Sequence, residues 1–389
     1  MDHDIVIVGG GPAGLSLALA LSGSGLRMAV VERQPASVLA APAHDGREIA
    51  LTHRSIDILR ELGAWARLPA GEIFPLRRAQ VLNGRSRAAL PFQPAAGGHE
   101  ALGCLVSNHL IRAALFEAME TRPDVTLVDR ATVDGVEADG GGAAVGLADG
   151  RRIDGRLVVA ADSRFSKLRE ALGIRAEINP IGKAMLVCRV EIERDHGGTA
   201  TEWFDHRQTL ALLPLAPNLA SAVLTVEQAE ADRLALLDDA AFGRELTSRY
   251  RRRWGAMAVA SGRHAYPLVT TFAQDFAVPG AALVGDAAVG MHPVTAHGFN
   301  LGLAGAALLA RRIRLALRRG SDWAGMDVLR AYERRHRLAC RPLYEGTNHL
   351  VRMFTDERPL ARGARMATIS MARRLPLLRA AVQRAVLQA

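Results

Sequence analysis

The sequence has few cysteines, few aromatic residues and no long apolar run. Its 389 residues include three cysteines and 5% aromatic residues. Cys104, Cys188 and Cys340 lie far apart and in no paired spacing, which argues against a disulfide framework and a zinc site. No stretch of about 18 uncharged apolar residues occurs, so we expect no transmembrane helix. The first residues, MDHDIVIVGGG, lack the features of a secretory signal, which predicts a cytoplasmic protein.

Lysine is absent from the C-terminal part of the chain, which is nevertheless strongly basic. From Arg311 onward there are 18 arginines and 6 acidic residues, in a protein of net charge +9. Residues 346–389 combine arginines with apolar residues at helical spacing. This pattern predicts basic helices that either rest on an anionic membrane surface or pack against the protein with a solvated face. Nucleic acid is not an expected partner, because no binding motif or aromatic cluster accompanies the charge.

The N-terminal segment DIVIVGGGPAGLSLALALSGSGLRMAVVERQ reads as strand, glycine turn, helix and second strand. Gly9, Gly11 and Gly14 form a GxGxxG spacing directly after the first apolar run. In this setting the first glycine permits a tight turn, the second lets backbone approach a pyrophosphate, and the third lets the helix pack on the strand. Glu32 ends the second strand, where a carboxylate can accept hydrogen bonds from a ribose. The segment predicts a dinucleotide site without distinguishing FAD from NAD.

The rest of the chain predicts a mixture of helices and strands around one nucleotide-binding unit. Apolar spacing predicts helices within residues 55–65 and 108–122. Short β runs occur from about 125 to 160, and a second β-rich stretch from about 181 to 228 precedes a polar helical segment. A buried strand near 281–285 is expected to return to the first sheet, and everything after it is expected to be helical. The stretch from 181 therefore looks inserted within the nucleotide-binding domain.

Residues 284–303, VGDAAVGMHPVTAHGFNLGL, concentrate an aspartate, two histidines and four glycines. A metal site is disfavoured, because His292 and His297 straddle a proline with no second carboxylate nearby. A nucleophile dyad is disfavoured, because Thr295 is the only local hydroxyl. Two interpretations stay open. Either Asp286 caps a helix and the histidines fill space, or Asp286 holds the ribityl hydroxyls of a flavin whose reduced ring faces the next helix start.

Three motifs carry a resemblance to a known family. Residues 285–300, GDAAVGMHPVTAHGFN, resemble the GDAAHxxxPxxGQGxN motif of class A flavoprotein monooxygenases, the group of para-hydroxybenzoate hydroxylase. ADSRFSKLREALG, from Ala161, resembles the family's DGxxSxxR motif, and the N-terminal glycine turn is the third. Within the group, DGREIALTHRSIDILRELGAW and VSNHLIRAAL look most like the ubiquinone-biosynthesis hydroxylases of the UbiH, UbiF and UbiM type. The resemblance covers about residues 3–345.

The sequence departs from the family pattern at four positions. Ser163 replaces the glycine of the DG pair, Val289 replaces a histidine, and Ala296 and His297 replace a Gly-Gln pair. The DG motif is associated in the family with both FAD and NAD(P)H, so Ser163 bears on the fit of the nicotinamide donor.

The resemblance implies an α/β fold with two domains. A Rossmann-type FAD-binding domain is expected to comprise residues 1–75, 101–180 and 276–345. An inserted β-sheet domain for the substrate is expected to comprise residues 76–100 and 181–275. Residues 346–389 are expected to form basic C-terminal helices.

The resemblance also implies which residues bind FAD. The expected cofactor-binding residues are Gly9, Gly11, Ala13, Gly14, Glu32, Arg33, Arg47, Asn108, Asp162, Asp286, Gly298, Phe299 and Asn300. A surface position for Arg47 and a helix N-cap role for Asn108 stay open as alternatives. His292, Pro293 and His297 are the candidate catalytic residues near the flavin ring, the histidines because their pKa suits proton transfer.

The resemblance finally implies a reaction. In this family NAD(P)H reduces FAD, O2 adds at the flavin C4a atom, and the hydroperoxide delivers one oxygen atom to an electron-rich ring. The expected substrate is a prenylated phenol or quinol of ubiquinone biosynthesis, which would bring the protein to the inner membrane and into a biosynthetic complex. A hydroxylase of small soluble aromatic compounds and a flavin-binding scaffold without turnover are the alternatives.

Overall fold

The computed structural model describes residues 3–84, 89–94, 98–139, 141–205, 208–293 and 297–355. Its first layer is a six-stranded sheet in the order β19-β20-β12-β1-β2-β8. The strands are β1 (Ile5–Val8), β2 (Met28–Val31), β8 (Val125–Val128), β12 (Leu157–Ala160), β19 (Ala277–Val278) and β20 (Ala281–Leu283). All but β19 pair in parallel. The strand at 281–283 therefore returns to the first sheet, as predicted.

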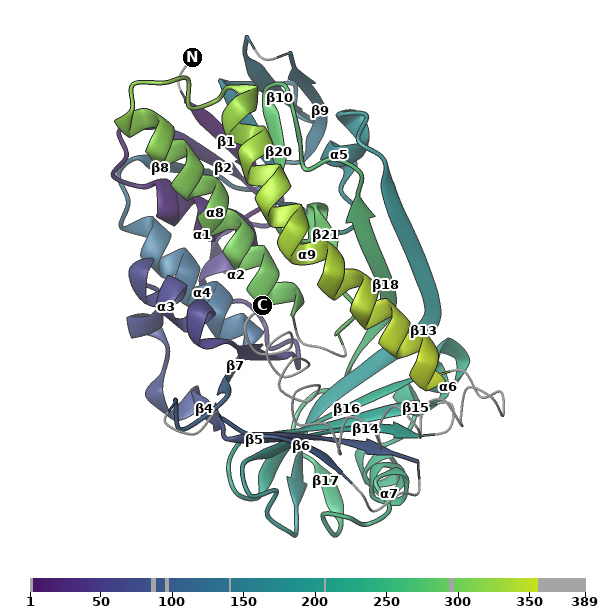
Figure 1. Ribbon diagram of the computed structural model, residues 1–389. Helices are drawn as coiled ribbons and strands as arrows, with labels where there is room; N and C mark the ends of the chain where they lie inside the picture. Colours follow the sequence, from purple (N-terminus) through teal and green to yellow (C-terminus); the bar gives the residue numbers. More distant parts are fainter. Residues whose placement is uncertain are drawn as a thin grey trace.

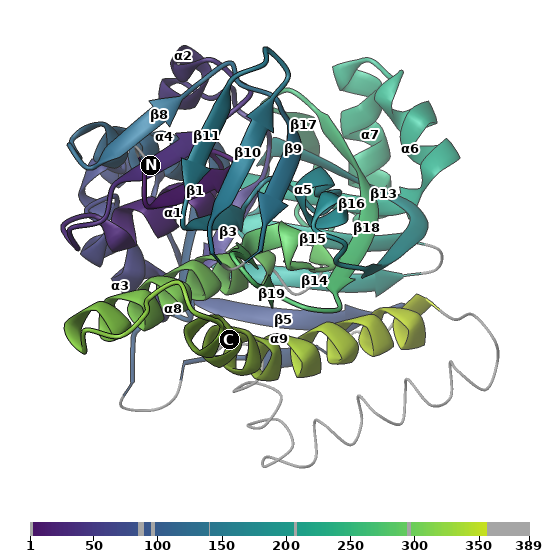
Figure 2. The ribbon, with the colours of Figure 1, turned by 90° about the horizontal axis from the view of Figure 1, so that it is seen from above.

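Both faces of this parallel sheet are covered, which explains why β1, β2 and β12 are continuous apolar runs. Helices α1 (Pro12–Leu21), α4 (Asn108–Glu120) and α8 (Gly298–Arg318) lie on one face. The other face carries a small antiparallel sheet of β9 (Val133–Ala138), β10 (Ala143–Leu147) and β11 (Arg152–Gly155). Figure 2 shows the parallel sheet between α8 and this small sheet.

The second layer is a nine-stranded sheet in the order β21-β18-β13-β16-β15-β14-β5-β6, with β17 paired to β13. It lies at the lower end of the molecule in Figure 1. The strands are β5 (Arg78–Asn83), β6 (Leu90–Phe92), β13 (Ala176–Ile192), β14 (Thr199–Asp205), β15 (Gln208–Pro214), β16 (Leu219–Glu227), β17 (Met257–Val259), β18 (His264–Ala273) and β21 (Val289–Gly290). One face packs on α6 (Gln228–Ala235) and α7 (Asp239–Arg249).

The boundary that we expected at residue 180 falls inside β13, a single strand of 17 residues. β13 pairs with β18 from Ala176 to Val187, so these two strands form a ribbon that runs from one layer to the other. Only the later part of β13, from Lys183, also pairs with β16. A sequence pattern cannot show this, because the apolar residues of the strand continue across the junction.

The remaining elements connect the two layers. A second three-stranded sheet has the order β3-β7-β4, and several short helices lie elsewhere along the chain. These elements are β3 (Glu48–Leu51), β4 (Phe74–Leu76), β7 (Gly103–Ser107), α2 (Ala36–Ala40), α3 (His53–Glu61), η1 (Trp65–Arg67), η2 (Ala70–Glu72), η3 (Gly285–Ala287) and α5 (Lys167–Ala171). Thr52 caps α3 by accepting a hydrogen bond from the Ser55 amide.

The chain ends its described part in α9 (Met326–Thr355), a 30-residue helix that crosses the front of the molecule in Figure 1. The first ten residues of the expected C-terminal segment therefore belong to α9, and residues 356–389 lie outside the described part. Within the described residues, no helix combines the length and the apolar content needed to cross a bilayer. The mixed α/β fold with a Rossmann-type layer and an inserted β-sheet is confirmed.

Candidate cofactor and substrate site

The carboxyl ends of the parallel strands form an edge built from closely packed backbone. Gly9 follows β1 with φ of +116°, and a Cβ atom there would overlap the carbonyl oxygen of Ala161, which follows β12. A Cβ atom at Gly14 would overlap the Gly9 carbonyl oxygen. Gly285, after β20, has φ of +62°, and its Cβ would lie 2.7 Å from Ala13 Cβ. Glycine is therefore needed at these positions for the chain itself to fold.

Gly11 differs from these glycines, because a Cβ atom there would meet no atom within 4 Å. It stands at the start of α1, whose first turn has no side-chain cap and no acidic residue. The free N–H groups and the positive end of the helix therefore face open space, the arrangement that binds phosphate groups. This edge fits the pyrophosphate of a dinucleotide.

Glu32 lies at the end of β2 beside this turn. Its carboxylate accepts hydrogen bonds from the amides of Gly10 at 2.7 Å and Gln34 at 2.9 Å. These bonds hold the carboxylate at the edge of the sheet, next to the space in front of α1. The adjacent Arg33 is exposed. The contacts of both residues to adenosine stay predictions.

Asp162 and Asp286 follow the neighbouring parallel strands β12 and β20. Arg164 joins this region to the second layer: it donates to the Asp286 carboxylate from Nη2 at 2.7 Å and from Nε at 3.2 Å, and to the Val269 carbonyl of β18 at 2.8 Å. Asp286 is therefore ion-paired and sits in a 3-10 turn. Ser163, the departure from the DG pair, accepts a hydrogen bond from the Phe165 amide and so stabilises the turn.

Arg169, the last residue of the DGxxSxxR-like motif, is 1% exposed. It donates to the carbonyl oxygens of Arg164 and Ala287, each at 3.1 Å, and burial lowers its pKa. The motif therefore links the loop after β12 to the loop after β20. The motif ADSRFSKLREALG contains both arginines, but the resemblance identified only Asp162 as a cofactor contact. The arginine that ends the DGxxSxxR pattern was the sequence signal for Arg169.

Arg47 and Asn108 meet at Asp45. Arg47 Nη2 lies 2.6 Å from Asp45 Oδ2, and Asn108 Nδ2 donates to the same oxygen at 2.7 Å. Burial opposes ionisation of Asp45, but Arg47 and Asn108 outweigh it and keep the pKa of the carboxyl below its ordinary value. Arg47 also stacks over Tyr266 of β18, whose hydroxyl donates to the Asp45 carbonyl at 2.7 Å. Asn108 is the first residue of α4 and not its N-cap, which is Ser107.

Directly beside this cluster, a buried ion-pair network connects the two layers. Arg189 of β13 donates to Glu48 at 2.9 Å, to Glu72 at 2.9 Å and to Ser107 at 2.7 Å. Ser107 in turn donates to Glu48 at 2.8 Å, and the Glu48 side chain is fully buried. Burial alone would lower the pKa of Arg189, but the two carboxylates hold it above its ordinary value. Glu48 follows Arg47 and Ser107 precedes Asn108 in the chain, so this network fixes both predicted cofactor contacts.

The motif around residue 290 is buried at the junction of the layers. His292 and His297 are 5% and 2% exposed. Burial lowers the pKa of His292 to about 4, with a further contribution from Lys183. Asn300 accepts a hydrogen bond from the Thr52 amide at 3.1 Å and donates to the Ala50 carbonyl at 2.9 Å, which fixes the start of α8 against β3. Gly298 and Phe299 form the first turn of α8, Pro293 precedes it, and residues 294–296 lie outside the described part.

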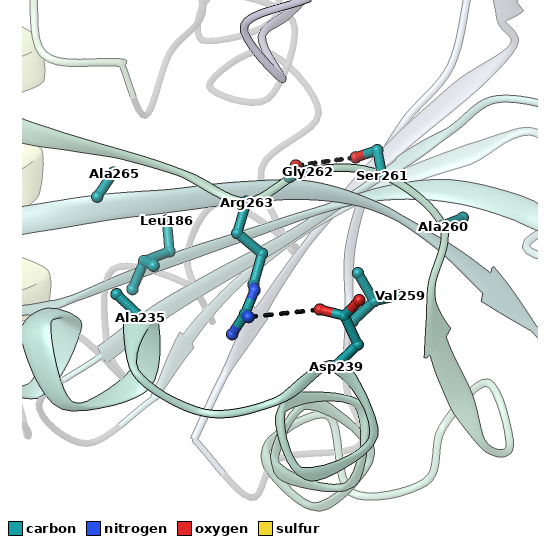
Figure 3. A pocket seen from close by; sticks show the side chains of 9 residues that line it. All are labelled: Leu186, Ala235, Asp239, Val259, Ala260, Ser261, Gly262, Arg263 and Ala265. Atoms are coloured by element: carbon teal, nitrogen blue, oxygen red, sulfur yellow. Dashed lines mark hydrogen bonds and ion pairs between the residues drawn. The ribbon is translucent and has the colours of Figure 1, made fainter.

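A separate cavity of about 540 Å³ lies on the opposite face of the nine-stranded sheet. Figure 3 shows Arg263 pointing across it to Asp239 at the start of α7, at 3.3 Å. Leu186 of β13 contributes to its lining. None of the predicted site residues lines this cavity, so it is distinct from the edge described above.

The chain matches the FAD binding domain family over residues 2–345. It is 44% identical over 361 residues to the ubiquinone hydroxylase UbiM of Neisseria meningitidis, an alignment that covers 92% of this chain and 78% of that protein. It is 30% identical to the 3-demethoxyubiquinol 3-hydroxylase of Escherichia coli, which covers 97% of this chain and 96% of that protein.

Solved structures share the fold. The p-nitrophenol 4-monooxygenase PnpA of Pseudomonas putida superposes with a TM-score of 0.78 at 18% identity and covers 99% of this chain and 96% of that one. PqsL of Pseudomonas aeruginosa, in complex with 2-aminobenzoylacetate, superposes with a TM-score of 0.74 at 22% identity and covers 89% and 93%. The chain belongs to the family of FAD-binding monooxygenases that includes the ubiquinone hydroxylases.

Proposed function

We propose that the protein hydroxylates the aromatic ring of a prenylated phenol or quinol in ubiquinone biosynthesis, with FAD as cofactor, NAD(P)H as electron donor and O2 as co-substrate. The observation that carries this proposal is the meeting of two surfaces at residues 45–48. There the loop that leads into β3 contacts the nine-stranded sheet through Tyr266 of β18 and Arg189 of β13. The names of the relatives supply the substrate class.

In this proposal different residues of the edge contact different parts of the cofactor. Gly9, Gly11, Ala13 and Gly14 hold the pyrophosphate, and Glu32 and Arg33 meet the adenosine. Asp162 and Asp286 hold the pyrophosphate and ribityl chain, and the backbone at Gly298, Phe299 and Asn300 lines the flavin ring. When bound, FAD supplies the electron transfer from NAD(P)H to O2. The layer built on the parallel sheet then serves the cofactor, while the nine-stranded sheet serves the substrate.

The buried histidines orient the ring pocket and exclude water in this proposal. His292 is neutral at neutral pH, because burial holds its pKa near 4. A neutral imidazole can accept or donate a hydrogen bond, but with this pKa it retains an extra proton poorly. We therefore assign His292 to shaping the pocket beside the flavin, and not to taking a proton from the substrate. Pro293 and His297 stay candidates for residues that lie near the flavin ring.

The direct test measures the product in cells and with the purified holoenzyme. We expect cells that lack the gene and have no redundant enzyme to accumulate a prenylated intermediate that lacks one or more ring oxygens, as read by mass spectrometry of lipid quinones. The purified protein should convert a short prenylated phenol to a hydroxylated product with consumption of NAD(P)H. An unchanged quinone profile together with turnover of small soluble phenols would favour the soluble-substrate alternative, and flavin binding without any turnover would favour a scaffold.

A second part of the proposal concerns the membrane. The exposed side of α9 carries Arg330, Arg334 and Arg335, for which the described residues provide no ion-pair partner, and Leu338, which is 71% exposed. Arginines beside an exposed leucine suit the interface of an anionic membrane. We propose that this face of α9, with the basic residues 356–389, places the protein on the cytoplasmic side of the inner membrane. A biosynthetic complex can assemble at the same membrane surface.

Binding to vesicles tests this placement. Replacing Arg330, Arg334 and Arg335 with glutamine should weaken binding to vesicles rich in anionic lipid, by about 1 kcal/mol per arginine. Truncation after Thr355 leaves α9 whole and should weaken binding further. Undiminished binding of both variants would contradict the membrane proposal. Exchange of the exposed Arg152, which is paired with Asp154 and Glu137, is the matched control.

A further inference from the structure

One row of residues crosses the nine-stranded sheet from the cofactor loop to its far edge. The strand registers pair His264 with Val187, Val187 with Val223, Val223 with Ala211, Ala211 with Glu202, and Glu202 with Val81. Paired residues point to the same side of a sheet. Within this row of described residues Glu202 has the one carboxyl group, and its paired neighbours Ala211 and Val81 are apolar.

The side of the sheet that carries this row is the side that meets the cofactor loop. A Cβ atom on Gly46, next to Arg47, would lie 2.8 Å from Val187 Cγ2 and 2.9 Å from the His264 ring. Arg189, two residues after Val187 and on the same face, reaches Glu48. With strands about 4.8 Å apart, Glu202 lies about 14 Å along the row from the loop.

The two faces of the sheet differ in how well they are covered. Leu82, Leu186 and Leu224 face α6 and α7 and are at most 2% exposed. On the cofactor side, Val81, Val223 and Glu202 are only partly buried. The cofactor side therefore offers apolar surface that the described chain does not cover. That surface suits an apolar substrate, and Glu202 and the paired Thr209 and Thr225 are polar groups on it.

Glu202 is an unusual carboxyl in this setting. The described residues form no hydrogen bond or ion pair with its carboxyl group. Desolvation raises the pKa of Glu202 to about 8. A carboxyl group that is this poorly solvated, yet partly uncovered, is available to a ligand with a hydroxyl group. Carboxyl groups tuned in this way are common in sites that transfer protons.

We propose that Glu202 is a catalytic residue that contacts the ring hydroxyl of the substrate and takes up its proton. This inference rests on the proposed function and deepens it. In the proton transfer, the phenolic O–H bond breaks, the proton moves to a Glu202 carboxylate oxygen, and the electron pair stays on the ring oxygen. The ionised ring oxygen raises the electron density of the ring that receives the new oxygen atom. The proton returns to solvent when the product leaves.

The titratable groups around Glu202 do not compete for this role. Its paired neighbours, Ala211 and Val81, do not titrate. On the other face, Tyr250 donates from its hydroxyl to the Ala211 carbonyl at 2.7 Å, and burial raises its pKa well above the ordinary value. Burial also raises the pKa of Cys188 to about 12. Both stay neutral in the range where Glu202 ionises, and His264 lies at the opposite end of the row.

The test compares Glu202→Gln with the wild-type holoenzyme, using 2-(3-methylbut-2-enyl)phenol as the probe substrate. We expect unchanged FAD content and a fall in kcat for hydroxylation of a hundredfold or more, the range of general base catalysis. The wild-type rate should rise with pH through about 8, because the carboxylate form accepts the proton, and this rise should be absent from Glu202→Gln. Glu202→Asp should restore part of the rate.

Glu191→Gln is the matched control, since Glu191 is an exposed glutamate on β13 of the same sheet. Wild-type kcat and an unchanged pH profile in Glu202→Gln would overturn the inference while leaving the proposed function intact. A wild-type enzyme that hydroxylates no prenylated phenol would instead reject the proposed function. If Glu202→Gln does not fold, Val81→Phe decides, because Val81 is the partly buried partner of Glu202 on β5. The larger side chain fills the surface beside Glu202 and should raise KM for the probe at least tenfold with FAD retained, whereas an unchanged KM would overturn the inference.

Discussion

The dinucleotide edge and the junction at residues 45–48 both hold predicted cofactor contacts, but they are built differently. At the edge, Gly9, Gly14 and Gly285 are required because backbone atoms approach too closely for any side chain. At the junction, Arg189 and Glu48 hold the loop through buried charges that come from different layers. A site built from backbone leaves glycines at fixed spacing in the sequence. A site built from side-chain contacts leaves isolated charged residues whose partners depend on strand register.

The largest effect is expected from a methyl group added at the dinucleotide edge, which tests whether that region depends on close backbone packing. We expect Gly14→Ala to prevent formation of a folded holoprotein, because its Cβ would overlap the Gly9 carbonyl oxygen. Gly11→Ala should fold normally, because its Cβ meets no protein atom within 4 Å, yet lose FAD affinity by occupying the space in front of α1. Circular dichroism and FAD content separate the two effects. Normal FAD content in Gly11→Ala would contradict the proposed pyrophosphate site.

At the junction of residues 45–48, the test is the removal of one buried charge. Arg189→Met leaves the fully buried Glu48 carboxylate without its cation, which should lower the free energy of unfolding by about 3–5 kcal/mol. Urea denaturation measures the loss. Arg263→Met is the control on the same sheet: its partner Asp239 is 72% exposed, so we expect a loss of less than about 1 kcal/mol from that pair. Equal losses would mean that the junction is not held by its buried charges.

A smaller effect on the free energy of unfolding is expected from a pH titration, through a buried histidine of the cofactor layer. His336 of α9 packs in the cofactor layer, and burial lowers its pKa from 6.5 to about 4. Between these values the unfolded chain binds more protons, so stability falls as the pH is lowered, by up to about 1.4 kcal/mol per pH unit for one histidine. His336→Leu should reduce this acid sensitivity, while exchange of the exposed His349 should not. A slope unaltered by His336→Leu would show that other groups, including His292, dominate.

The sequence predicted the backbone-built part of the molecule well. The βαβ unit, the glycine turn and the return of the strand at 281–283 followed from spacing, because close backbone approach restricts the residue type. The family followed from the resemblance of three motifs to those of known flavoproteins. The positions of Asp162 and Asp286 after neighbouring strands also agree with the motifs, although their contacts to FAD stay predictions.

The side-chain part could not be predicted from the sequence. Arg189 and Glu48 lie far apart in the chain, and only the pairing of β13 with its neighbours brings them together. Glu202 lies in the short apolar stretch TEWF, where alternation alone does not say which side of the strand faces the cofactor layer. The boundary inside β13 was missed for the same reason. These features depend on register, which a single sequence does not specify.

The pairing of β20 with β12 also has a consequence for biosynthesis. β12 ends at Ala160, but its neighbour β20 begins at Ala281, after the whole nine-stranded sheet has been encoded except for β21. Proteins emerge from the ribosome N-terminus first, at about 5–20 residues per second. The loop that carries Asp286 therefore leaves the ribosome many seconds after the glycine turn. Until then a nascent chain can present only half of the flavin site, so cofactor loading is expected to be one of the last steps in making this protein.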